Sequence, residues 1–339
     1  MVKKEICIIS NDKFKVNNKN IIAPEKNTIS IIDAFNKFYI VYLIARKTNN
    51  KNLFVSKNKK IVFFSTLQFI KEIKLFRNKK FLFISITPYN FMMILILKIF
   101  GFKTENITSY LISDGFKEYK TKFGYIGYLI YYLMFLIFKN FSKIITCSNH
   151  ITKLKYNSCV YPSTINSEWL KNRKIDKKLK INKIKLLYIG RFRKEKGYKS
   201  LINIFLDLKG NYFLSMLGAK YNLLNKKKNI RIIKKISNIS KIINIIDKHH
   251  ILILPSYTEG YPQVILESFA RLKPVIIFEE IEFIKDIFTN GIFACKRNSK
   301  DFKTLVDSII KNYTEHQKKI KSCRILSIID FQKDLRKYF

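Results

Sequence analysis

Two glutamates near position 260 could hold a polyhydroxylated ligand, because a carboxylate accepts hydrogen bonds and donates none. Glu259 is expected in a loop, and Glu267 about a turn and a half into the following helix. This separation suits two parts of one ligand, such as a ribose and a hexose, better than one metal ion or one shared proton. Taken alone, the pair is equally compatible with a helix charge and a solvated loop acid.

The sequence around the two glutamates predicts a strand, a loop, a helix and a second strand. Ile251–Leu254 is an aliphatic run typical of a strand buried on both faces, and Pro255 ends it. Pro262 can begin the helix, because the first helical position does not need its N–H. Val275–Phe278 is the next buried strand. Ligands of open parallel sheets bind at the carboxyl ends of strands, beside helix N-termini that favour anions.

A basic loop bracketed by glycines, Gly190–Gly197, lies upstream of this unit. It follows another buried strand candidate, Lys185–Ile189, and precedes a helix expected from Tyr198 to about Leu208. The two glycines allow a tight turn and a close backbone approach. Arg191 and Lys196 would then stand on the same rim as the glutamates, where a guanidinium fork and an ammonium group form a plausible diphosphate clamp. Because the chain holds 65 lysines and arginines, the glycines support this interpretation more than the charges do.

Together the two segments resemble the donor-site signature of glycosyltransferase family 4, whose members are retaining GT-B enzymes that use nucleotide-activated sugars. The resemblance rests on Gly190-Arg191…Glu195-Lys196-Gly197 and on Pro255-Ser256…Glu259-Gly260-Tyr261-Pro262…Glu267-Ser268…Pro274-Val275. One departure is Leu272-Lys273 before Pro274, where the family usually has a small residue or glycine; it concerns the exit from the helix rather than the site.

The resemblance implies a role for each matching residue. Arg191 and Lys196 would hold the donor diphosphate, while Glu259 would contact the transferred sugar and Glu267 the ribose hydroxyls. We expect the donor site to include Gly190, Arg191, Lys196, Gly218, Glu259, Gly260, Tyr261 and Glu267.

The fold that the resemblance implies is α/β GT-B, with two doubly wound Rossmann-like domains facing across a cleft. Alternation of strand and helix independently predicts a parallel, doubly wound sheet. We expect an N-terminal acceptor-binding domain over 1–165, a linker over 166–182 and a nucleotide-sugar donor-binding domain over 183–315. A C-terminal helix over 316–339 would cross back to the first domain. The linker is predicted because Ser163–Asn182 is polar and basic without an apolar period.

Local patterns in the first half predict further elements. Ile6–Ser10 is expected as a strand followed by a polar loop, and Thr28–Arg46 as a helix with a capping residue at its start. Ser148 is expected to open a short helix, and Cys159–Pro162 to form the last strand of the domain.

An aspartate follows the strand expected at Ile107–Ile112 and therefore lies at a carboxyl-end rim of the first domain. In the resembling family an acidic residue or histidine on this rim often helps to place the acceptor hydroxyl. The resemblance implies this role for Asp114, with Lys117 and Tyr119 on the acceptor side. A capping or turn role for an aspartate before Gly115 is at least as compatible with the sequence.

The composition fits an anionic partner. The formal net charge is +41, with 65 Lys and Arg against 24 Asp and Glu. Nucleotides, nucleic acids and acidic membrane surfaces all suit such a chain, although a lysine- and asparagine-rich composition throughout accounts for part of the excess. The sequence has no zinc spacing, RNA-binding sheet motif or compact basic helix. We therefore expect no nucleic-acid partner, and a basic nucleic-acid-binding protein is the alternative from another class.

Three features of the sequence bear on where the protein is located in the cell. The five cysteines show no paired spacing, which favours a reducing cytoplasm over a disulfide framework or zinc site. The N-terminus does not read as a secretory signal. Phe123–Phe138 holds no formal charge but is shorter than the roughly 20 residues of a spanning helix. It is either an inner helix of the domain or a segment that lies peripherally against the anionic cytoplasmic face of the inner membrane.

The expected chemistry needs no metal and no cofactor. The chain has no Asp-x-Asp pair, so cationic side chains and helix N-termini would stabilise the departing diphosphate. The expected reaction moves a sugar from a nucleotide-sugar donor to a saccharide or polyprenyl-linked acceptor in bacterial surface polysaccharide synthesis, with retention implied by the family alone. Alternatives are an inverting GT-B transferase and a sugar-nucleotide epimerase. The candidate catalytic residues are Arg191, Lys196, Glu259 and Asp114.

Overall fold

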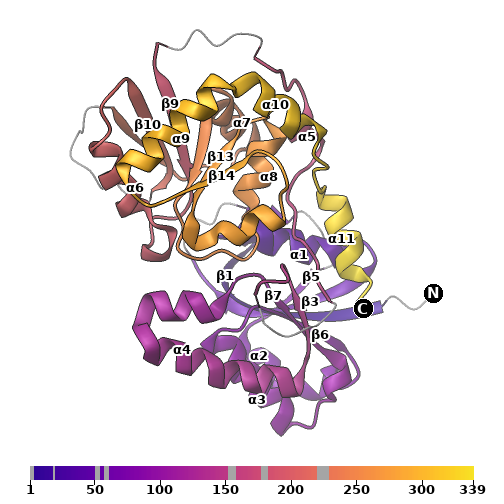
Figure 1. Ribbon diagram of the computed structural model, residues 1–339. Helices are drawn as coiled ribbons and strands as arrows, with labels where there is room; N and C mark the ends of the chain where they lie inside the picture. The colour runs from indigo at the N-terminus through magenta and orange to yellow at the C-terminus, as the bar shows by residue number, and fades with distance from the viewer. Residues whose placement is uncertain are drawn as a thin grey trace. The chain divides into compact units, whose positions relative to one another are not determined.

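The computed structural model describes residues 4–17, 20–49, 54–56, 61–151, 158–176, 182–219 and 229–339. The chain forms two compact units. The first comprises Met1–Thr164 together with Ser327–Phe339, and the second comprises Ile165–Leu326. Each unit is an α/β layer structure built on its own mostly parallel sheet (Figure 1).

The first unit has a parallel sheet with β1 (Lys4–Asn17) near its centre. The parallel strands follow the order β5-β3-β1-β6-β7-β8, which is the strand order of the Rossmann fold. The other five strands of this order are β3 (Tyr39–Lys47), β5 (Ile61–Phe64), β6 (Lys80–Ile84), β7 (Ile107–Leu111) and β8 (Lys143–Thr146). Beyond its parallel part, β1 turns antiparallel onto β2 (Asn20–Ala23), which in turn pairs with β4 (Phe54–Ser56).

Helices connect these strands, and side chains at their N-termini accept hydrogen bonds from the first backbone N–H groups. Ser65 forms a capping box with Gln68, and Thr87 accepts from the backbone N–H of Asn90. The helical segments are α1 (Lys26–Asn36), α2 (Thr66–Lys71), a 3₁₀ turn (Ile73–Phe76), α3 (Pro88–Ile99), a second 3₁₀ turn (Thr104–Asn106) and α4 (Gly115–Phe141).

Four local predictions for this unit were wrong. The helix expected over Thr28–Arg46 ends at Asn36, and the β-branched and aromatic run from Tyr39 forms β3 between β1 and β5. The strand from Ile6 does not end at Ser10 but continues to Asn17. The described residues from Ser148 to Ile151 make turns rather than a helix. The strand expected at Cys159–Pro162 is reduced to one bridge, from Cys159 to Thr146.

The second unit has a six-stranded, wholly parallel sheet in the order β11-β10-β9-β12-β13-β14. This is again the Rossmann order. Every residue of β12 and β13 is buried, as their aliphatic runs predict for strands covered on both faces. The six strands are β9 (Ile184–Ile189), β10 (Tyr212–Ala219), β11 (Ile230–Lys234), β12 (Ile251–Leu254), β13 (Val275–Phe278) and β14 (Ile292–Cys295).

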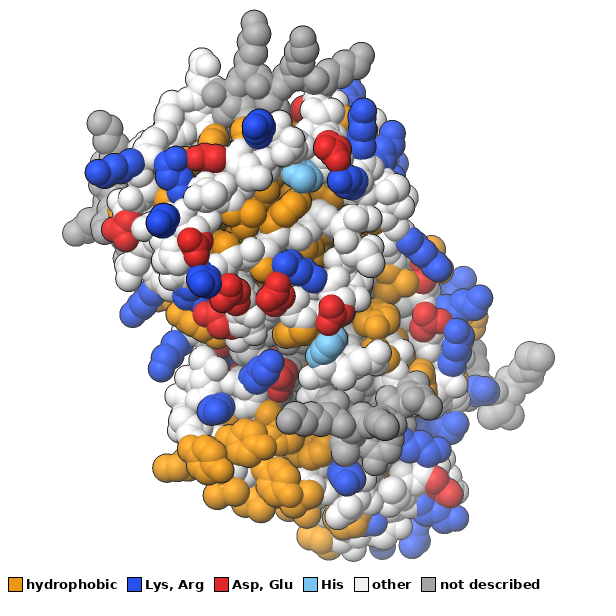
Figure 2. Space-filling view, in the orientation of Figure 1, with side chains coloured by type: hydrophobic (Ala, Val, Ile, Leu, Met, Phe, Trp, Pro, Cys, Tyr) orange, Lys and Arg blue, Asp and Glu red, His pale blue; other side chains and the backbone are white. Residues whose placement is uncertain are grey.

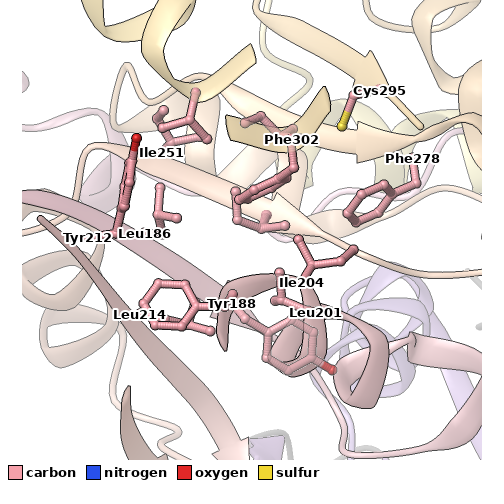
Figure 3. Close-up of a cluster of buried hydrophobic side chains, with 14 of the residues drawn as sticks. Leu186, Tyr188, Leu201, Ile204, Tyr212, Leu214, Ile251, Phe278, Cys295 and Phe302 are labelled. Atoms are coloured by element: carbon pink, nitrogen blue, oxygen red, sulfur yellow. The ribbon is translucent and has the colours of Figure 1, made fainter. Parts of the chain in front are cut away.

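A core of aliphatic and aromatic side chains lies between this sheet and its helices. Leu186 and Tyr188 from β9 lie among Leu201 of α6, Phe278 of β13 and Phe302 of α9 (Figure 3). The helical segments of the unit are α5 (Ser167–Leu170), a 3₁₀ turn (Lys194–Lys196), α6 (Tyr198–Leu206), α7 (Ile239–Asp247), α8 (Gln263–Ala270), a 3₁₀ segment (Glu279–Asp286), α9 (Ser299–Lys311) and α10 (Tyr313–Ser322).

The predicted linker belongs to the second unit, and the predicted terminal helix is divided between the two units. The described part of 166–182 belongs to the second unit: Trp169 is fully buried, and Arg271 donates to the carbonyl oxygens of Trp169 and Lys171 at 3.0 and 2.7 Å. Within 316–339, α10 stays with the second unit, and α11 (Ile328–Arg336) joins the first. The Arg336 guanidinium donates to the carbonyl of Ala34 in α1 at 2.7 Å.

Candidate functional site

Two loops follow the carboxyl ends of β9 and β12, the adjacent central strands of the second sheet. The chain leaves β9 toward β10 on one side and leaves β12 toward β13 on the other. The two loops therefore flank the topological switch point, where open α/β sheets bind their ligands. This is the edge at which the sequence predicts a site.

The first loop is fixed to the sheet by its backbone. Gly190 donates its N–H to the carbonyl of Leu217 at 3.0 Å, and the buried Tyr188 hydroxyl donates to the carbonyl of Arg191 at 2.7 Å. Burial raises the pKa of Tyr188 well above its usual value of 10.0, so this hydroxyl keeps its proton. The Arg191 side chain is exposed at this rim.

Two glycines permit close backbone approaches around this loop. Gly197 has a left-handed φ of 63°, and a Cβ placed on it would lie 1.8 Å from the carbonyl oxygen of Pro255. Gly218, near the carboxyl end of β10, has a φ of 123°, and a Cβ there would lie 2.1 Å from the carbonyl oxygen of Gly190. Only glycine fits such contacts, so these residues bring three strand ends together.

The second loop is bonded directly to the first. The N–H of Tyr257 donates to the carbonyl of Glu195 at 2.9 Å. The Lys196 ammonium lies 2.6 Å from Oε1 of Glu259, and that same oxygen accepts a 2.6 Å bond from the Ser256 hydroxyl. The side chains of Lys196 and Glu259 are only 19% and 9% exposed, so solvent screens this ion pair little.

The remaining donor-site candidates lie on or beside α8. Gly260 and Tyr261 are buried in the turn before the helix, and the Tyr261 ring packs on Phe288 with centroids 5.3 Å apart. Glu267 is half-buried on the second turn of α8. Where the resembling family has a small residue or glycine, Leu272 adopts a left-handed φ of 58° and is fully buried. The leucine therefore carries a backbone strain that glycine would not.

Sequence reasoning missed Arg297, which follows β14 and holds the second loop in place. Its Nη1 donates to the carbonyl of Pro255 at 2.9 Å and to the Ser200 hydroxyl at 2.8 Å, while its Nε and Nη2 reach the Glu280 carboxylate at 2.7 and 3.0 Å. Its guanidinium also stacks 4.1 Å from the centroid of the Tyr257 ring. One more arginine among 65 basic residues, far along the chain from the loop, offered no sequence signal.

The acceptor-side candidates lie in the first unit. Asp114 is the N-cap of α4: its Oδ1 accepts from the Lys117 N–H at 3.1 Å, and its Oδ2 lies 4.0 Å from the Lys117 ammonium. Burial raises the pKa of Asp114 above its ordinary 3.8. The hydrogen bond from the Lys117 N–H and the positive charge of Lys117 lower this pKa, but by less than burial raises it. Tyr119 packs against Phe123 and Tyr131 at centroid distances of 5.9 and 5.2 Å. The capping interpretation of Asp114 therefore matches its geometry, and its acceptor role stays a prediction.

Within the described ranges, no group of three or more His, Cys, Asp or Glu side chains is arranged to hold a metal ion. The arrangement instead offers cations and helix N-termini to an anion, together with carboxylates to hydroxyl groups.

Comparison with known proteins agrees with this geometry. Residues 171–324, which contain both loops, match the family Glycosyl transferases group 1. The chain is also 30% identical over 134 residues to an uncharacterised glycosyltransferase, MJ1178 of Methanocaldococcus jannaschii. That match covers 37% of this chain and 38% of the relative.

Several solved structures resemble this chain over nearly its whole length. Anabaena Alr3699/HepE in complex with UDP-glucose matches with a TM-score of 0.68 and 11% identity, over 98% of each chain. The apo form of the lipopolysaccharide outer core galactosyltransferase WaaB matches with a TM-score of 0.65 and 14% identity, again over 98% of each chain. The protein has the α/β GT-B fold with Rossmann-like units, which confirms the predicted fold class.

Proposed function

We propose that the protein is a glycosyltransferase that moves a sugar from a nucleotide-sugar donor to a saccharide or lipid-linked acceptor, with retention, in bacterial surface polysaccharide synthesis. The observation that carries the proposal is the contact between Lys196 and Glu259 across two loops at the sheet's switch point. The group 1 match over 171–324 supports the reaction class, and the likeness to HepE with UDP-glucose supports the donor class. The likeness to WaaB supports the surface polysaccharide role.

The rim offers the donor one partner for each of its parts. Arg191 and Lys196 suit the diphosphate, because a guanidinium fork and an ammonium group together neutralise phosphate charge. Glu259 takes the bonds from Lys196 and Ser256 on one oxygen, Oε1. Its Oε2 is then the atom that accepts from a hydroxyl of the transferred sugar. Glu267, on the second turn of α8, takes the ribose hydroxyls.

The reaction breaks the bond between the sugar's anomeric carbon and the diphosphate, and forms one between that carbon and an acceptor oxygen. The acceptor's proton passes to the leaving phosphate. As the bond to the anomeric carbon breaks, its electron pair stays on the diphosphate and negative charge grows there, and Lys196 can follow this charge by shifting from Glu259 toward the phosphate oxygens. Stabilising developing charge in this way is typically the largest contribution to catalysis. We propose that this chemistry proceeds without a metal or cofactor.

We place the reaction in the cytoplasm. The cysteines Cys7, Cys147, Cys159, Cys295 and Cys323 are all free. Free thiols throughout a chain are typical of a reducing compartment.

A thermal-shift screen of UDP-, GDP- and ADP-sugars tests the donor assignment. We expect saturable stabilisation by one nucleotide class, because a ligand that binds only the folded state raises its melting temperature. Transfer from that donor to a saccharide acceptor, followed by anomeric analysis of the product, then separates retention from inversion. Interconversion of the donor without an acceptor would instead identify an epimerase. Salt-sensitive binding to random duplex DNA, with no response to any nucleotide sugar, would overturn the proposal.

A further inference from the structure

Helix α4 of the first unit is folded back on itself. Gly124 interrupts it with a φ of 67° and a ψ of −153°. The segment before Gly124 then packs along the segment after it: the Phe116 ring lies 4.8 Å from that of Tyr131 and 5.2 Å from that of Phe135. A Cβ added to Gly115 would lie only 2.0 Å from the Tyr131 ring. The result is a tight helical hairpin.

One face of the second segment packs against the unit. Phe138 is fully buried and lies 5.5 Å from the Phe83 ring of β6. Gly127, Tyr131, Met134 and Phe135 are buried on the same face. Their spacing is the three-to-four residue period of a helix that covers a core.

The opposite face is apolar as well, and it is exposed. We call this face the apolar strip: Phe123, Tyr125, Ile126, Tyr128, Leu129, Ile130, Tyr132 and Leu133. Ile126 is 72% exposed, and Leu129 and Leu133 are 51% and 55% exposed. The exposed face of a surface helix is normally polar, yet no charged residue occurs from Phe123 to Phe138. Figure 2 shows the resulting hydrophobic patch where Figure 1 places α4. A contiguous exposed patch of this kind marks an interaction site.

The geometry favours a surface contact over a membrane crossing. By length and composition alone, Gly115–Phe141 is apolar enough to span a bilayer. However, the break at Gly124 shortens it, and its buried face is already occupied by the unit. From Tyr125 to Leu133, the part of the strip after the break rises only about 12 Å along the helix, against about 30 Å of hydrocarbon.

The charge of the protein indicates which kind of partner covers the apolar strip. Lys120 lies in the first arm of the hairpin, Lys139 lies in the last turn of the second arm, and Lys143 follows it; all three are exposed. With a net charge of +41, a second copy of this chain would be repelled, whereas an anionic lipid surface would be attracted. Exposed tyrosines also suit the headgroup level of a membrane.

We propose that the apolar strip docks the first unit on the surface of an anionic bilayer. Ile126, Leu129 and Leu133 enter the boundary between headgroups and acyl chains, and the flanking lysines contact lipid phosphates. The contact is peripheral, as for other helices that lie in the membrane interface. It does not depend on the proposed transfer activity.

Co-sedimentation of the full-length protein with vesicles tests the docking. The vesicles contain phosphatidylcholine alone or with about one third phosphatidylglycerol, so that only the second kind carries the anionic charge that attracts basic groups. We expect binding to the anionic vesicles only, with weakening at high salt. The triple variant Ile126→Ser, Leu129→Ser, Leu133→Ser should bind them at least about tenfold more weakly, because it removes three large apolar side chains from the contact.

A matched control carries the same three substitutions elsewhere. Leu67, Leu75 and Ile329 are 74%, 67% and 72% exposed and lie outside α4, so Leu67→Ser, Leu75→Ser, Ile329→Ser changes the same side-chain types. This control should bind vesicles like the unaltered protein. Both triple variants replace exposed side chains, and equal melting temperatures would show that both are folded.

Lysine variants test the electrostatic half of the proposal. Lys120→Gln, Lys139→Gln, Lys143→Gln should weaken binding by about fivefold for each lysine removed. The same charge change at the exposed Lys209, Lys241 and Lys311 of the second unit should have a much smaller effect.

Four results would overturn the docking proposal. These are equal binding to neutral and anionic vesicles, no binding to either, unaltered binding by the α4 triple variant, and a protein that detergent alone extracts from membranes. Concentration-dependent dimerisation that the α4 variant abolishes would assign the strip to a second copy instead.

Discussion

The two units share one strand order but differ at the switch point. In the second unit, β9 stops at Ile189, and a short basic loop bracketed by glycines follows. In the first unit, β1 continues beyond Ser10, where its pairing with β6 ends, and turns into an antiparallel pair with β2. The same edge of the sheet is thus a charged loop in one unit and continuing strand in the other. A common topology leaves chemistry to the loops that follow the strands.

The ion pairs of the two units differ in the same way. Asp114 and Lys117 are three residues apart and meet within the first turn of one helix. Lys196 and Glu259 are 63 residues apart and meet only because two loops are held together. The Asp114 cap can form from residues that are close in the sequence, whereas Lys196 and Glu259 meet only in the folded unit. The four predictions below compare the activity and the stability that depend on the loops of the second unit with those that depend on matched residues, most of them in the first unit.

The largest effect is expected from Lys196→Ala and Glu267→Ala. Each should lower turnover at least about 100-fold, because each removes a charged partner of the donor; losing one such stabilising group typically raises the barrier by about 2.7–4 kcal/mol. Steady-state kinetics with the donor found in the screen measures this.

The matched variant is Lys117→Ala in the first unit. It should raise the KM for the acceptor and leave the donor's thermal shift unchanged. Full donor consumption by Lys196→Ala and Glu267→Ala would remove the site assignment.

Gly197→Ala should destabilise the protein by about 3 kcal/mol, because it combines a left-handed backbone with a steric clash. The clash is with the carbonyl of Pro255, 1.8 Å from the added Cβ. Gly101→Ala in the first unit is the control, since Gly101 has a φ of 74° but no atom within 4 Å of the added Cβ. It should lose only about 1 kcal/mol. Chemical denaturation measures the free energy of unfolding of both variants. Equal losses of stability would mean that the packing of the two loops does not depend on the contact between Gly197 and Pro255.

Arg297→Lys should lower kcat/KM for the donor about tenfold, because an ammonium group cannot replace a guanidinium that bonds a carboxylate and a carbonyl together. We expect the loss in the donor's KM rather than in kcat, since Arg297 positions the loop without touching the reacting atoms. Arg336→Lys is the control: Arg336 also bonds a carbonyl and stacks on a ring, Phe38, but in the first unit. An equal effect of both variants on donor KM would contradict the positioning role.

The smallest expected effect is on the pH dependence of the free energy of unfolding, to which two carboxylates contribute with opposite sign. Burial raises the pKa of Asp114, so its folded form binds a proton more firmly, and stability falls as pH rises above about 3.8. For Glu280, burial raises the pKa of the carboxyl group. The hydrogen bonds from Arg297 and from the backbone N–H of Glu280, together with the positive charge of Arg297, outweigh burial and hold this pKa below its ordinary 4.5. Its contribution is present above that pH and is lost as pH falls through the lowered folded pKa.

Unfolding free energies from pH 2 to 7 test this contrast, because that range brackets both ordinary carboxyl pKa values of about 4. Asp114→Asn keeps an N-cap side chain and should gain stability relative to the unaltered protein as pH rises. Glu280→Gln should lose stability over the same rise. Parallel curves for the two variants would show that the two environments do not differ.

The sequence by itself determined the strand, loop, helix and strand around the two glutamates. Pro255, Pro262 and the aliphatic runs act within a few residues of their own positions, so their pattern is readable without the fold. The glycine-bracketed loop is equally local, and its Gly197 lies where the first loop meets the carbonyl of Pro255 in the second. The resemblance to a donor-site signature followed from these same residues.

Only the tertiary structure decided which neighbours those elements meet. The run from Tyr39 forms a strand because β1 and β5 pair with it on both sides, which no local propensity reports. Arg297 lies beyond the carboxyl end of β14, the edge strand of the sheet, and reaches Pro255 although the two residues are 42 positions apart in the chain. The apolar strip became visible once packing had covered the other face of α4. Long-range contacts select among the states that local sequence allows, and their partners are distant in the chain.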